Sequence, residues 1–371
     1  MRLSWSQALT WRMGRQLLDP IGTLSAPDVV RRLGGVQAQV ASTAELAVRV
    51  RQQHSEPGDV AAALADGSLI KTWAMRGALH LLTPEEGGAF LSLMASTRTW
   101  ELPSWQRYFG MQASHWDVMR GTVHEALDGP PLTREELMTA IVAHPDLAHL
   151  GAEVRSGWGT LFKPLAWQGD LCYGPSQGTR VTFTRPDRAS ARWAGVPAPD
   201  EAAPVVIRAY LGAYGPATAA NLRNWLSRGR IGPRTLRAWL AELGPALSEV
   251  ELDGVRAYVR AEDLDDLAAT KPSDVVRLVP GFDAVVLGPG TDDTTVVAAA
   301  RRSAVSRQAG WIAPVVMAGG RVSGTWELEN DAVRIGWFAE SGAPPRIALG
   351  AEVERLSEIL GNSLRAEVAA V

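Results

Sequence analysis

Residues 233–259 are the stretch that decides the fold, and they read PRTLRAWLAELGPALSEVELDGVRAYV. Apolar residues recur at helical spacing over Pro233–Leu243, which predicts a helix. Two short segments, Val250–Leu252 and Val255–Val259, then flank Asp253-Gly254, a dipeptide typical of tight hairpin turns. The stretch therefore predicts a helix followed by a two-stranded wing.

Two further helices precede this stretch. One is expected over Glu201–Tyr214, and Gly215-Pro216-Ala217-Thr218 begins another that continues to Trp225. Three short helices followed by a two-stranded wing are the winged form of the helix-turn-helix. This class most often binds nucleic acid, although it also serves as a protein-docking module.

The same order of elements occurs upstream, between residues 116 and 184. Thr133 and Glu136 have the spacing of a capping box at the start of a helix. The expected elements are helices over Trp116–Leu127, from Pro131 and near Arg155–Gln168, and then a hairpin of Leu171–Tyr173 with Val181–Phe183.

The N-terminal part fits as a third, longer copy. Ser25 and Pro27 provide a plausible helix start, and Met75-Arg76-Gly77 is the expected turn of a wing. The elements are helices over Trp5–Leu18, Ala26–Leu33 and Val60–Ala65, and a wing of Leu69–Trp73 with Ala78–Leu82.

The last hundred residues differ in character, because short apolar segments alternate with glycine turns. The expected strands are Val275–Val279, Ala284–Leu287, Ala313–Met317, Val322–Trp326 and Val333–Phe338. The final segment, Ala351–Val371, has a helical pattern. A small sheet or barrel-like subdomain is therefore expected there.

These patterns together predict an α+β protein with three tandem winged helix-turn-helix motifs and a C-terminal small β-rich subdomain. The expected divisions are 1–113, which holds the first repeat, 114–198 and 199–270 for the next two, and 271–371 for the subdomain and C-terminal helix. Three such modules would line a concave groove long enough for a DNA duplex.

The composition is that of an ordinary soluble globular protein. The 371 residues suffice for two or three domains, and a net charge of −3 gives no general signal for a polyanion partner. Cys172 is the single cysteine, which excludes an internal disulfide. The first 25 residues contain charges and no uninterrupted apolar core, so we expect neither a signal peptide nor a membrane span, and a cytoplasmic, nucleoid-associated location.

The distribution of charge is more informative than its sum. Residues 202–241 contain six arginines and no acid, and residues 294–326 form a second acid-free window. Only three residues of the chain are lysine, and guanidinium binds phosphate in a forked geometry. Either window alone is best explained as a solvated face, whereas both together favour a nucleic-acid surface. The candidate DNA contacts are Arg223, Arg228, Arg230, Arg234 and Arg237.

A second candidate contact is the turn through residues 307–311. Arg307, Gln308 and Trp311 join a cation, an amide and an aromatic ring, and we hypothesise that this hairpin probes the groove of a damaged duplex. The fourteen tryptophans would offer stacking surfaces, although most are expected in the core.

The best candidate for chemistry is the pair Gln37 and Gln39, just past Gly34-Gly35. Residues two apart point the same way from extended backbone, whereas on a helix they diverge. The amides can position a water or a base edge but cannot take up a proton. From the pattern alone, two ordinary amides capping a helix end are the more common explanation.

Other polar residues are weaker candidates for a cleft. Arg76 and His80 belong to the first wing, although a histidine between two leucines is more often structural. Asp283 follows a Pro-Gly-Phe bend and would bind a cation, line the cleft or cap a turn. No metal or cofactor is expected, because no phosphate-binding glycine loop occurs and four other histidines lack ligand spacing. Those histidines are His115, His124, His144 and His149.

Several segments resemble those of the AlkZ/YcaQ winged-helix DNA glycosylases, and the resemblance covers essentially the whole chain. The matching segments are Gly35–Gln39, Lys71–Leu82, Pro280–Asp283 with Leu287-Gly288, and Gly320–Trp326. The glutamine, aliphatic, glutamine pattern is that of the AlkZ branch, which gives self-resistance to a DNA-crosslinking antibiotic. The YcaQ branch carries an acid at the second polar position.

The resemblance implies that Gln37 and Gln39 are the catalytic pair and that the substrate is double-stranded DNA carrying N7-alkylated purines or interstrand crosslinks. Such a purine is already cationic, so its glycosidic bond is weakened and the base leaves neutral. Amides that orient water and face an oxocarbenium-like sugar then suffice. An open groove suits a tethered base that cannot rotate freely out of the duplex.

A monofunctional enzyme and a monomer are expected, since Lys71 is the only lysine of the first repeat and a Schiff base is therefore less favoured. The competing hypothesis is a non-enzymatic DNA-binding regulator or damage sensor. A protein-docking scaffold is a third, which the acid-free arginine windows make less attractive.

Overall fold

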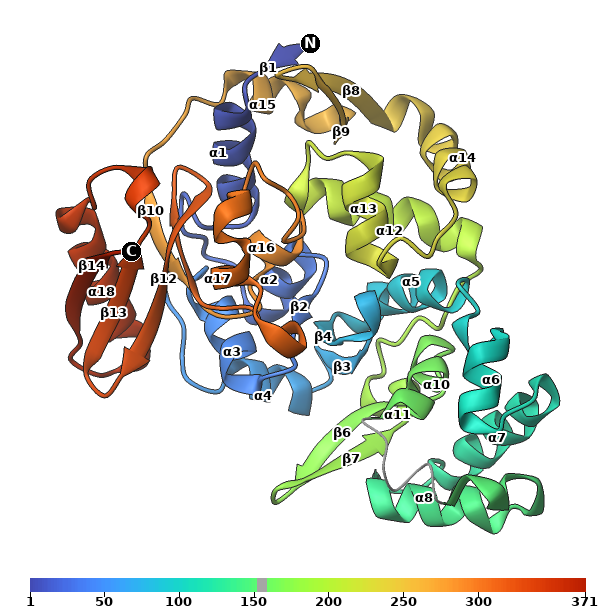
Figure 1. Ribbon diagram of the computed structural model, residues 1–371. Coiled ribbons are helices and arrows are strands. Elements are labelled where there is room, and N and C mark those ends of the chain that lie inside the picture. The colour runs from blue at the N-terminus through green and yellow to red at the C-terminus, as the bar shows by residue number, and fades with distance from the viewer. Residues whose placement is uncertain (152–158) are drawn as a thin grey trace. The chain divides into compact units, whose positions relative to one another are not determined.

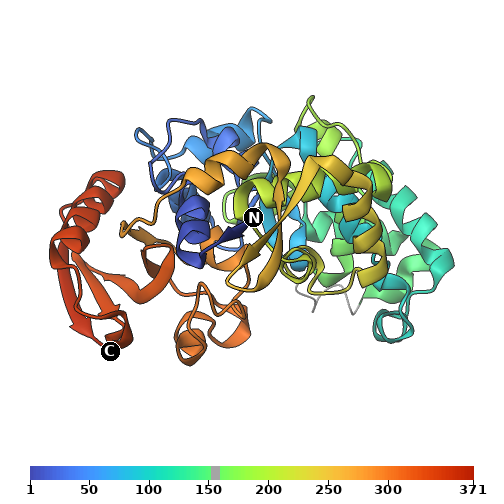
Figure 2. The ribbon, with the colours of Figure 1, turned by 90° about the horizontal axis from the view of Figure 1, so that it is seen from above.

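The computed structural model describes residues 1–151 and 159–371, and they form two compact units (Figures 1 and 2). Unit 1 comprises residues 1–60, 207–225 and 233–371, and unit 2 comprises residues 61–206 and 226–232. The units gather segments that are distant along the chain, whereas the boundaries expected above follow the chain itself. Those boundaries remain a prediction.

The helices and hairpin expected between residues 199 and 260 are present. Asp253 and Gly254 have φ angles of 47° and 88°, as a tight hairpin turn between strands requires. The elements are α12 (Pro199–Tyr214), α13 (Ala219–Ser227), α14 (Pro233–Leu243), β8 (Leu247–Leu252), β9 (Val255–Arg260) and α15 (Leu264–Ala269).

The N-terminus of the chain joins this last hairpin. Strand β1 (Arg2–Leu3) pairs in parallel with β8, and helix α1 (Trp5–Arg15) begins at a Ser4 capping box. Leu3 and Ala8 share a core with apolar residues of β8, β9 and α15. The first expected helix therefore packs on the wing of the last repeat, a long-range contact that periodicity could not indicate.

The next elements of unit 1 are α2 (Ala26–Arg32), β2 (Val36–Gln37) and α3 (Ala41–Arg49). Ser25 caps α2 by accepting a hydrogen bond from the Asp28 N–H, and proline occupies the first turn, as expected. Helix α3 was not expected from the sequence, and it packs against α2 and β2.

The C-terminal sheet of unit 1 has the order β10-β11-β12-β13-β14. Helix α18 (Arg346–Leu360) lies along one face of it (Figures 1 and 2), and Leu349, Val353 and Leu356 enter the core of the sheet. The strands are β10 (Val276–Val279), β11 (Val315–Ala318), β12 (Arg321–Glu329), β13 (Ala332–Trp337) and β14 (Arg365–Ala370).

Two expectations for this region are wrong. Ala284–Leu287 is helix α16 rather than a strand, because the Asp283 carboxylate accepts from the Val285 N–H and caps a helical turn. The segment Ala351–Val371 is not wholly helical. Gly361, with φ of 69°, ends α18 in the left-handed conformation, and β14 follows as a parallel partner of β13.

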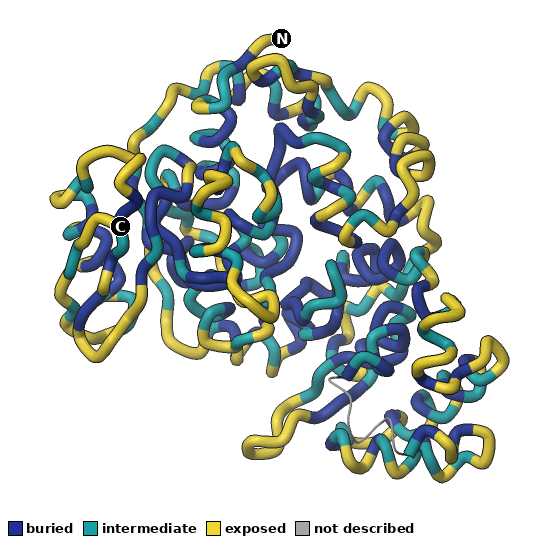
Figure 3. The backbone as a smooth tube through the Cα atoms, in the orientation of Figure 1, coloured by how far each residue is buried: buried dark blue, intermediate teal, exposed yellow. Residues whose placement is uncertain are grey.

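In unit 2 the first two expected wings form one antiparallel sheet. The strands are β3 (Ile70–Trp73), β4 (Leu79–Leu82), β5 (Leu132–Thr133), β6 (Cys172–Gln177) and β7 (Arg180–Thr184). Strand β3 pairs with β4 and also with β6, through Lys71 and Tyr173. The free end of the β6–β7 hairpin is exposed, whereas its base is buried (Figure 3).

Short helices surround this sheet. They are α4 (Asp59–Ala65), α5 (Pro84–Ala95), α6 (Pro103–Phe109), α7 (Ala113–Ala126), α8 (Arg134–Ala143), α10 (Lys163–Trp167) and α11 (Pro186–Ala189). The expected capping box of Thr133 and Glu136 is present at the start of α8. The helix expected near Arg155–Gln168 lies partly outside the described residues, and its described end is α10.

Most tryptophans belong to the core, as expected: Trp100, Trp116, Trp167 and Trp225 are all buried. Trp311 differs, with 44% of its surface exposed. Within residues 1–151 and 159–371, no helix is long and apolar enough to cross a membrane.

Candidate active site and nucleic-acid interface

The two glutamines lie on a short extended segment between helices α2 and α3, which we call the glutamine segment (residues 33–40). Gly34 and Gly35 have φ angles of 63° and 111°, so they break the chain away from α2. Gln37 is half-buried in β2, Ala38 is buried and Gln39 is exposed. Of the two alternatives left open by the spacing, this alternation agrees with the extended one rather than with a helix, although Gln39 itself lies in a bend.

A buried tyrosine supports the start of the glutamine segment. The Tyr214 hydroxyl donates a 2.6 Å hydrogen bond to the Leu33 carbonyl, immediately before the two glycines. Tyr214 packs against the rings of Tyr210 and Trp225, and a Cβ added at Gly288 would lie 2.2 Å from the Tyr214 ring. The segment is therefore held by a side chain from a helix about 180 residues away.

The helix that follows the segment is held by a buried ion pair at its far end. Arg51, which follows α3, binds both carboxylate oxygens of Asp283 at 2.6 and 2.8 Å, and both side chains are fully buried. Arg51 also donates to the carbonyls of Gln16 and Ala47. This network anchors α3, the helix that begins two residues after Gln39.

Asp283 is thus placed in the interior and not in a cleft. It caps α16 and neutralises Arg51, so its carboxylate has no free oxygen for a cation. Of the roles considered from the sequence, the turn cap is the one that matches this geometry.

The segment 307–311 forms the expected tight hairpin. The Arg307 N–H donates to the Trp311 carbonyl at 2.8 Å, and Ser306 and Ile312 form a bridge beneath it. Arg307 pairs with Glu327 at 3.0 Å, and the exposed Trp311 ring packs edge-on against Phe282 at 5.0 Å. The exposed aromatic tip is therefore braced by the Pro280–Asp283 bend.

His80 is a neutral, buried member of the wing in unit 2. It is 2% exposed, and burial together with the charge of Arg76 lowers its pKa to about 3. Its Nδ1 lies 3.0 Å from the Ala78 carbonyl, which can only accept, so Nδ1 donates and Nε2 is the acceptor. The structural interpretation of His80 fits this environment better than a groove residue. Arg76 has φ of 57° at the hairpin turn.

The predicted DNA-contact arginines fall on both units. Arg234 and Arg237 are exposed on α14, and Arg223 is half-buried on α13. Arg228 and Arg230 are exposed on the turn that follows α13, which belongs to unit 2. Exposure leaves four of these five guanidinium groups available to a ligand.

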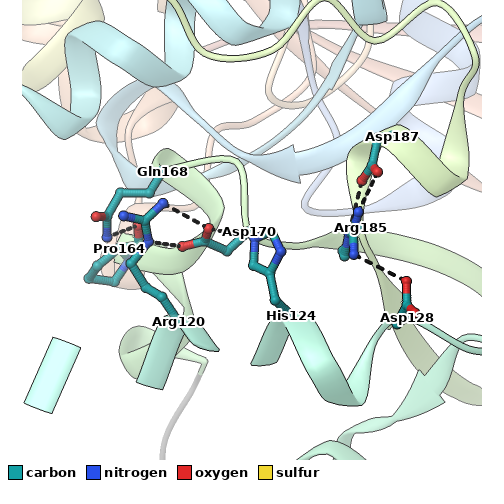
Figure 4. A network of polar contacts seen from close by, with 8 residues as sticks. All are labelled: Arg120, His124, Asp128, Pro164, Gln168, Asp170, Arg185 and Asp187. Atoms are coloured by element: carbon teal, nitrogen blue, oxygen red, sulfur yellow. Dashed lines mark hydrogen bonds and ion pairs between the residues drawn. The ribbon is translucent and has the colours of Figure 1, made fainter. Parts of the chain in front are cut away.

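Unit 2 also contains a polar network that the sequence did not indicate (Figure 4). Arg120 and His124 of α7 both bind the buried Asp170 carboxylate, with Arg120 at 2.7 and 3.0 Å and His124 at 3.0 Å. The i, i+4 spacing of the two bases was the available signal, but Asp170 lies 46 residues beyond. The network fixes the loop before β6 on α7.

No group of three or more metal-ligating side chains occurs within the described part of the chain. His115 and His149 are neighbours, with ring centroids 5.2 Å apart, but no third ligand joins them there. Cys172 is free and buried, and burial raises the pKa of its thiol well above the usual range, which makes it unreactive.

Comparison with known families identifies the class. A family model described as DNA glycosylase AlkZ-like matches residues 30–359, which is most of the chain. The protein is therefore a DNA glycosylase, a hydrolase acting on N-glycosyl bonds, and its substrate is DNA.

The chain belongs to the AlkZ-like family. It is 48% identical over 364 residues to the interstrand DNA cross-link repair glycosylase of Streptomyces sahachiroi, covering 98% of both chains. Its structure is similar to that of the DNA glycosylase AlkZ from Streptomyces sahachiroi, with a TM-score of 0.97, 47% identity and complete coverage of both chains. These similarities support the enzyme over the non-enzymatic regulator and confirm the mixed α and β fold.

Proposed function

We propose that this glycosylase releases N7-alkylated purines from duplex DNA, including bulky adducts and interstrand crosslinks, with Gln37 and Gln39 as the catalytic pair. The observation that supports the proposal most is the geometry of the glutamine segment. Gln37 ends strand β2 and Gln39 lies in the bend that follows, while buried contacts hold the start of the segment and the helix after it. The cross-link repair relative supports the substrate class.

The chemistry follows from the absence of a proton acceptor in the pair. An N7-alkylated purine carries a positive charge, so departure of the base needs no proton. The sugar develops the charge instead, and an amide oxygen directed at it would stabilise that charge while the second amide orients water. The same argument predicts little release of undamaged adenine or guanine.

DNA binding would use the exposed arginines of the third repeat together with the tip of the hairpin at residues 307–311. Arg234, Arg237, Arg228 and Arg230 would contact phosphates, and Arg307, Gln308 and Trp311 would probe the groove beside the lesion. Three winged repeats would line a concave groove for the duplex. The proposed working form is a monomer in the cytoplasm.

The test is base release from a duplex containing one N7-methylguanine, measured under single-turnover conditions. Gln37→Ala and Gln39→Ala should each lower the release rate by about 10²-fold, the loss typical of removing one transition-state contact, with unchanged duplex affinity. Gln53→Ala is the matched control, because Gln53 is an exposed glutamine of the same unit.

Normal release by both variants would reject the assignment of the pair. Release of normal purines by the wild-type enzyme at a comparable rate would reject the mechanism, whichever residues carry it. A crosslinked duplex tested in the same way would decide whether the substrates include interstrand crosslinks.

A further inference from the structure

We propose that unit 2 contains a binding site for a phosphate of the DNA backbone, formed by Lys163, Arg228 and Arg230 beside the tip of the β3–β4 hairpin. The proposal rests on the proposed function in one respect, namely that the turn after α13 contacts DNA. It adds Lys163, a residue with no role so far, and it assigns the chemistry of the contact.

Lys163 lies against the hairpin tip. It is the first residue of α10, and its side chain is half-buried. A Cβ added at Gly77 would lie 3.7 Å from both Cδ and Nζ of Lys163, and 3.6 Å from the Trp167 ring. Gly77 has φ of 69° at the turn, a conformation that favours glycine, and the ammonium group of Lys163 lies at van der Waals distance from that position.

Arg228 and Arg230 come from a constrained turn of the same unit. The Ile231 N–H donates to the Ser227 hydroxyl at 3.1 Å, and the Arg230 N–H donates to the Ser227 carbonyl at 3.3 Å. Arg228 has φ of 54°, an unusual backbone conformation for a residue with a long side chain. Both side chains are exposed, so the turn presents two guanidinium groups to the solvent.

The turn of Arg228 and Arg230 is grouped by its contacts with residues 61–206, the part of unit 2 that contains Lys163. Burial lowers the pKa of Lys163, and the charges of Arg228 and Arg230 lower it further. Within residues 1–151 and 159–371, none of the three forms an ion pair with a carboxylate, whereas Arg120, Arg260 and Arg334 each do. Three like charges without a counter-ion repel, and a bound anion would relieve that repulsion.

The phosphodiester of DNA is the anion that the enzyme's substrate supplies. Its oxygens accept forked hydrogen bonds from guanidinium and a point contact from ammonium, and the charges recur regularly along the duplex. The contact carries no sequence information, which suits an enzyme that must act wherever a lesion occurs. Inorganic phosphate has the same chemistry, and the experiment therefore distinguishes the two sources.

The first measurement is the affinity for an undamaged duplex as a function of NaCl concentration. Lys163→Met keeps the length of the packed stem and removes the charge, so the slope of log affinity against log salt should fall by about one. When the salt concentration is lowered from 200 to 50 mM, the affinity of the variant should therefore rise roughly threefold less than that of the wild-type enzyme. Arg228→Gln combined with Arg230→Gln should lower the slope by about two.

Matched variants complete the comparison. Lys271→Met removes an exposed lysine of unit 1 and should leave the slope unchanged, and Lys163→Arg should restore most of it. A folded Lys163→Met protein with the wild-type slope would overturn the proposal. Undamaged DNA is used throughout, so failure of the glutamine mechanism would not affect this result.

A second measurement needs no variant. The chain has only three lysines, Lys71, Lys163 and Lys271, so mild acetylation followed by mass spectrometry can follow each one. The duplex should protect Lys163 and leave Lys271 reactive. Absence of protection would overturn the site, and equal protection by millimolar inorganic phosphate alone would overturn the assignment to the DNA backbone.

Discussion

The glutamine segment of unit 1 and the cationic residues beside the β3–β4 hairpin tip of unit 2 have different physical requirements. The segment presents neutral amides on backbone that is fixed by Tyr214 at one end and by the Arg51–Asp283 pair beyond the other. Beside the tip, Lys163, Arg228 and Arg230 form no ion pair with a carboxylate among the described residues, and the arginine charges act on Lys163. Catalytic groups need exact placement, whereas attraction to a polyanion needs charge and tolerates movement. The contrast predicts that packing changes damage the first region and charge changes the second.

The largest effect on stability and base release is expected from Gly288→Ala, which changes the packing behind the glutamine segment. The added methyl group would lie 2.2 Å from the buried Tyr214 ring, so the ring must move and its hydrogen bond to Leu33 is lost. We expect a loss of about 3 kcal/mol in the free energy of unfolding, the upper end for overpacking. Base release should fall sharply, and denaturant titration with single-turnover kinetics would measure both quantities.

Gly350→Ala is the control for that substitution. No described atom lies within 4 Å of a Cβ at Gly350, which is inside helix α18. Alanine there should leave stability equal or slightly higher, since glycine is a poor helix former. Equal behaviour of the two variants would contradict the role given to the Tyr214 contact.

A smaller effect is expected from Tyr214→Phe, which removes the hydroxyl and keeps the ring. The Leu33 carbonyl then loses a buried hydrogen bond, at a cost of about 2 kcal/mol. If the bond positions the glutamine segment, the release rate should fall while the affinity for undamaged duplex stays constant. A rate equal to the wild-type rate would show that Tyr214 serves stability alone.

The pH dependence of stability tests the environment of His80 in the β3–β4 hairpin. The pKa of His80 is lowered to about 3 in the folded state, whereas an unfolded histidine titrates near 6.5. Between these values the unfolded state binds the extra proton, so stability rises with pH and is lost as the pH falls below about 6.5.

The slope from this one group is about 1.4 kcal/mol per pH unit. His80→Gln should therefore reduce the dependence of the melting temperature on pH between 5 and 6.5. The salt slope of DNA binding should not change, because His80 is neutral and buried. An unchanged pH dependence in the variant would show that other groups carry it.

The smallest effect is expected from Thr133→Ala, which removes the capping box of α8. Loss of the cap should cost about 1 kcal/mol of unfolding free energy. Because Lys163, Arg228 and Arg230 would act through charge, duplex affinity and its salt dependence should remain at wild-type values. A changed salt slope would mean that the contact of unit 2 with the duplex depends on the stability of its fold as well as on charge.

The sequence predicted those elements whose signals are local. Asp253-Gly254, the Thr133 capping box and the Gly34-Gly35 break all act within a few residues, and each has the expected geometry. Ala284–Leu287 was assigned wrongly because a four-residue apolar run fits a strand or a helical turn equally well, and the cap by Asp283 decides between them.

The supports of the candidate site could not be predicted, because they connect distant segments. Tyr214 reaches Leu33, Arg51 reaches Asp283, and Lys163 lies beside Gly77, and no periodicity joins these positions. The sequence indicated the residue types suited to chemistry and to DNA. Their surroundings, which determine whether each type is available, required the structure.

The pairing of β1 with β8 has a consequence for biosynthesis. Arg2 and Leu3 are made some 250 residues before their partners Glu251 and Leu252. Unit 1 also includes β14, so its C-terminal sheet cannot be complete until Arg365–Ala370 has been made. Unit 2 consists mainly of one continuous stretch, which can fold earlier. Strand β1 therefore remains without its partner strand until β8 has been made.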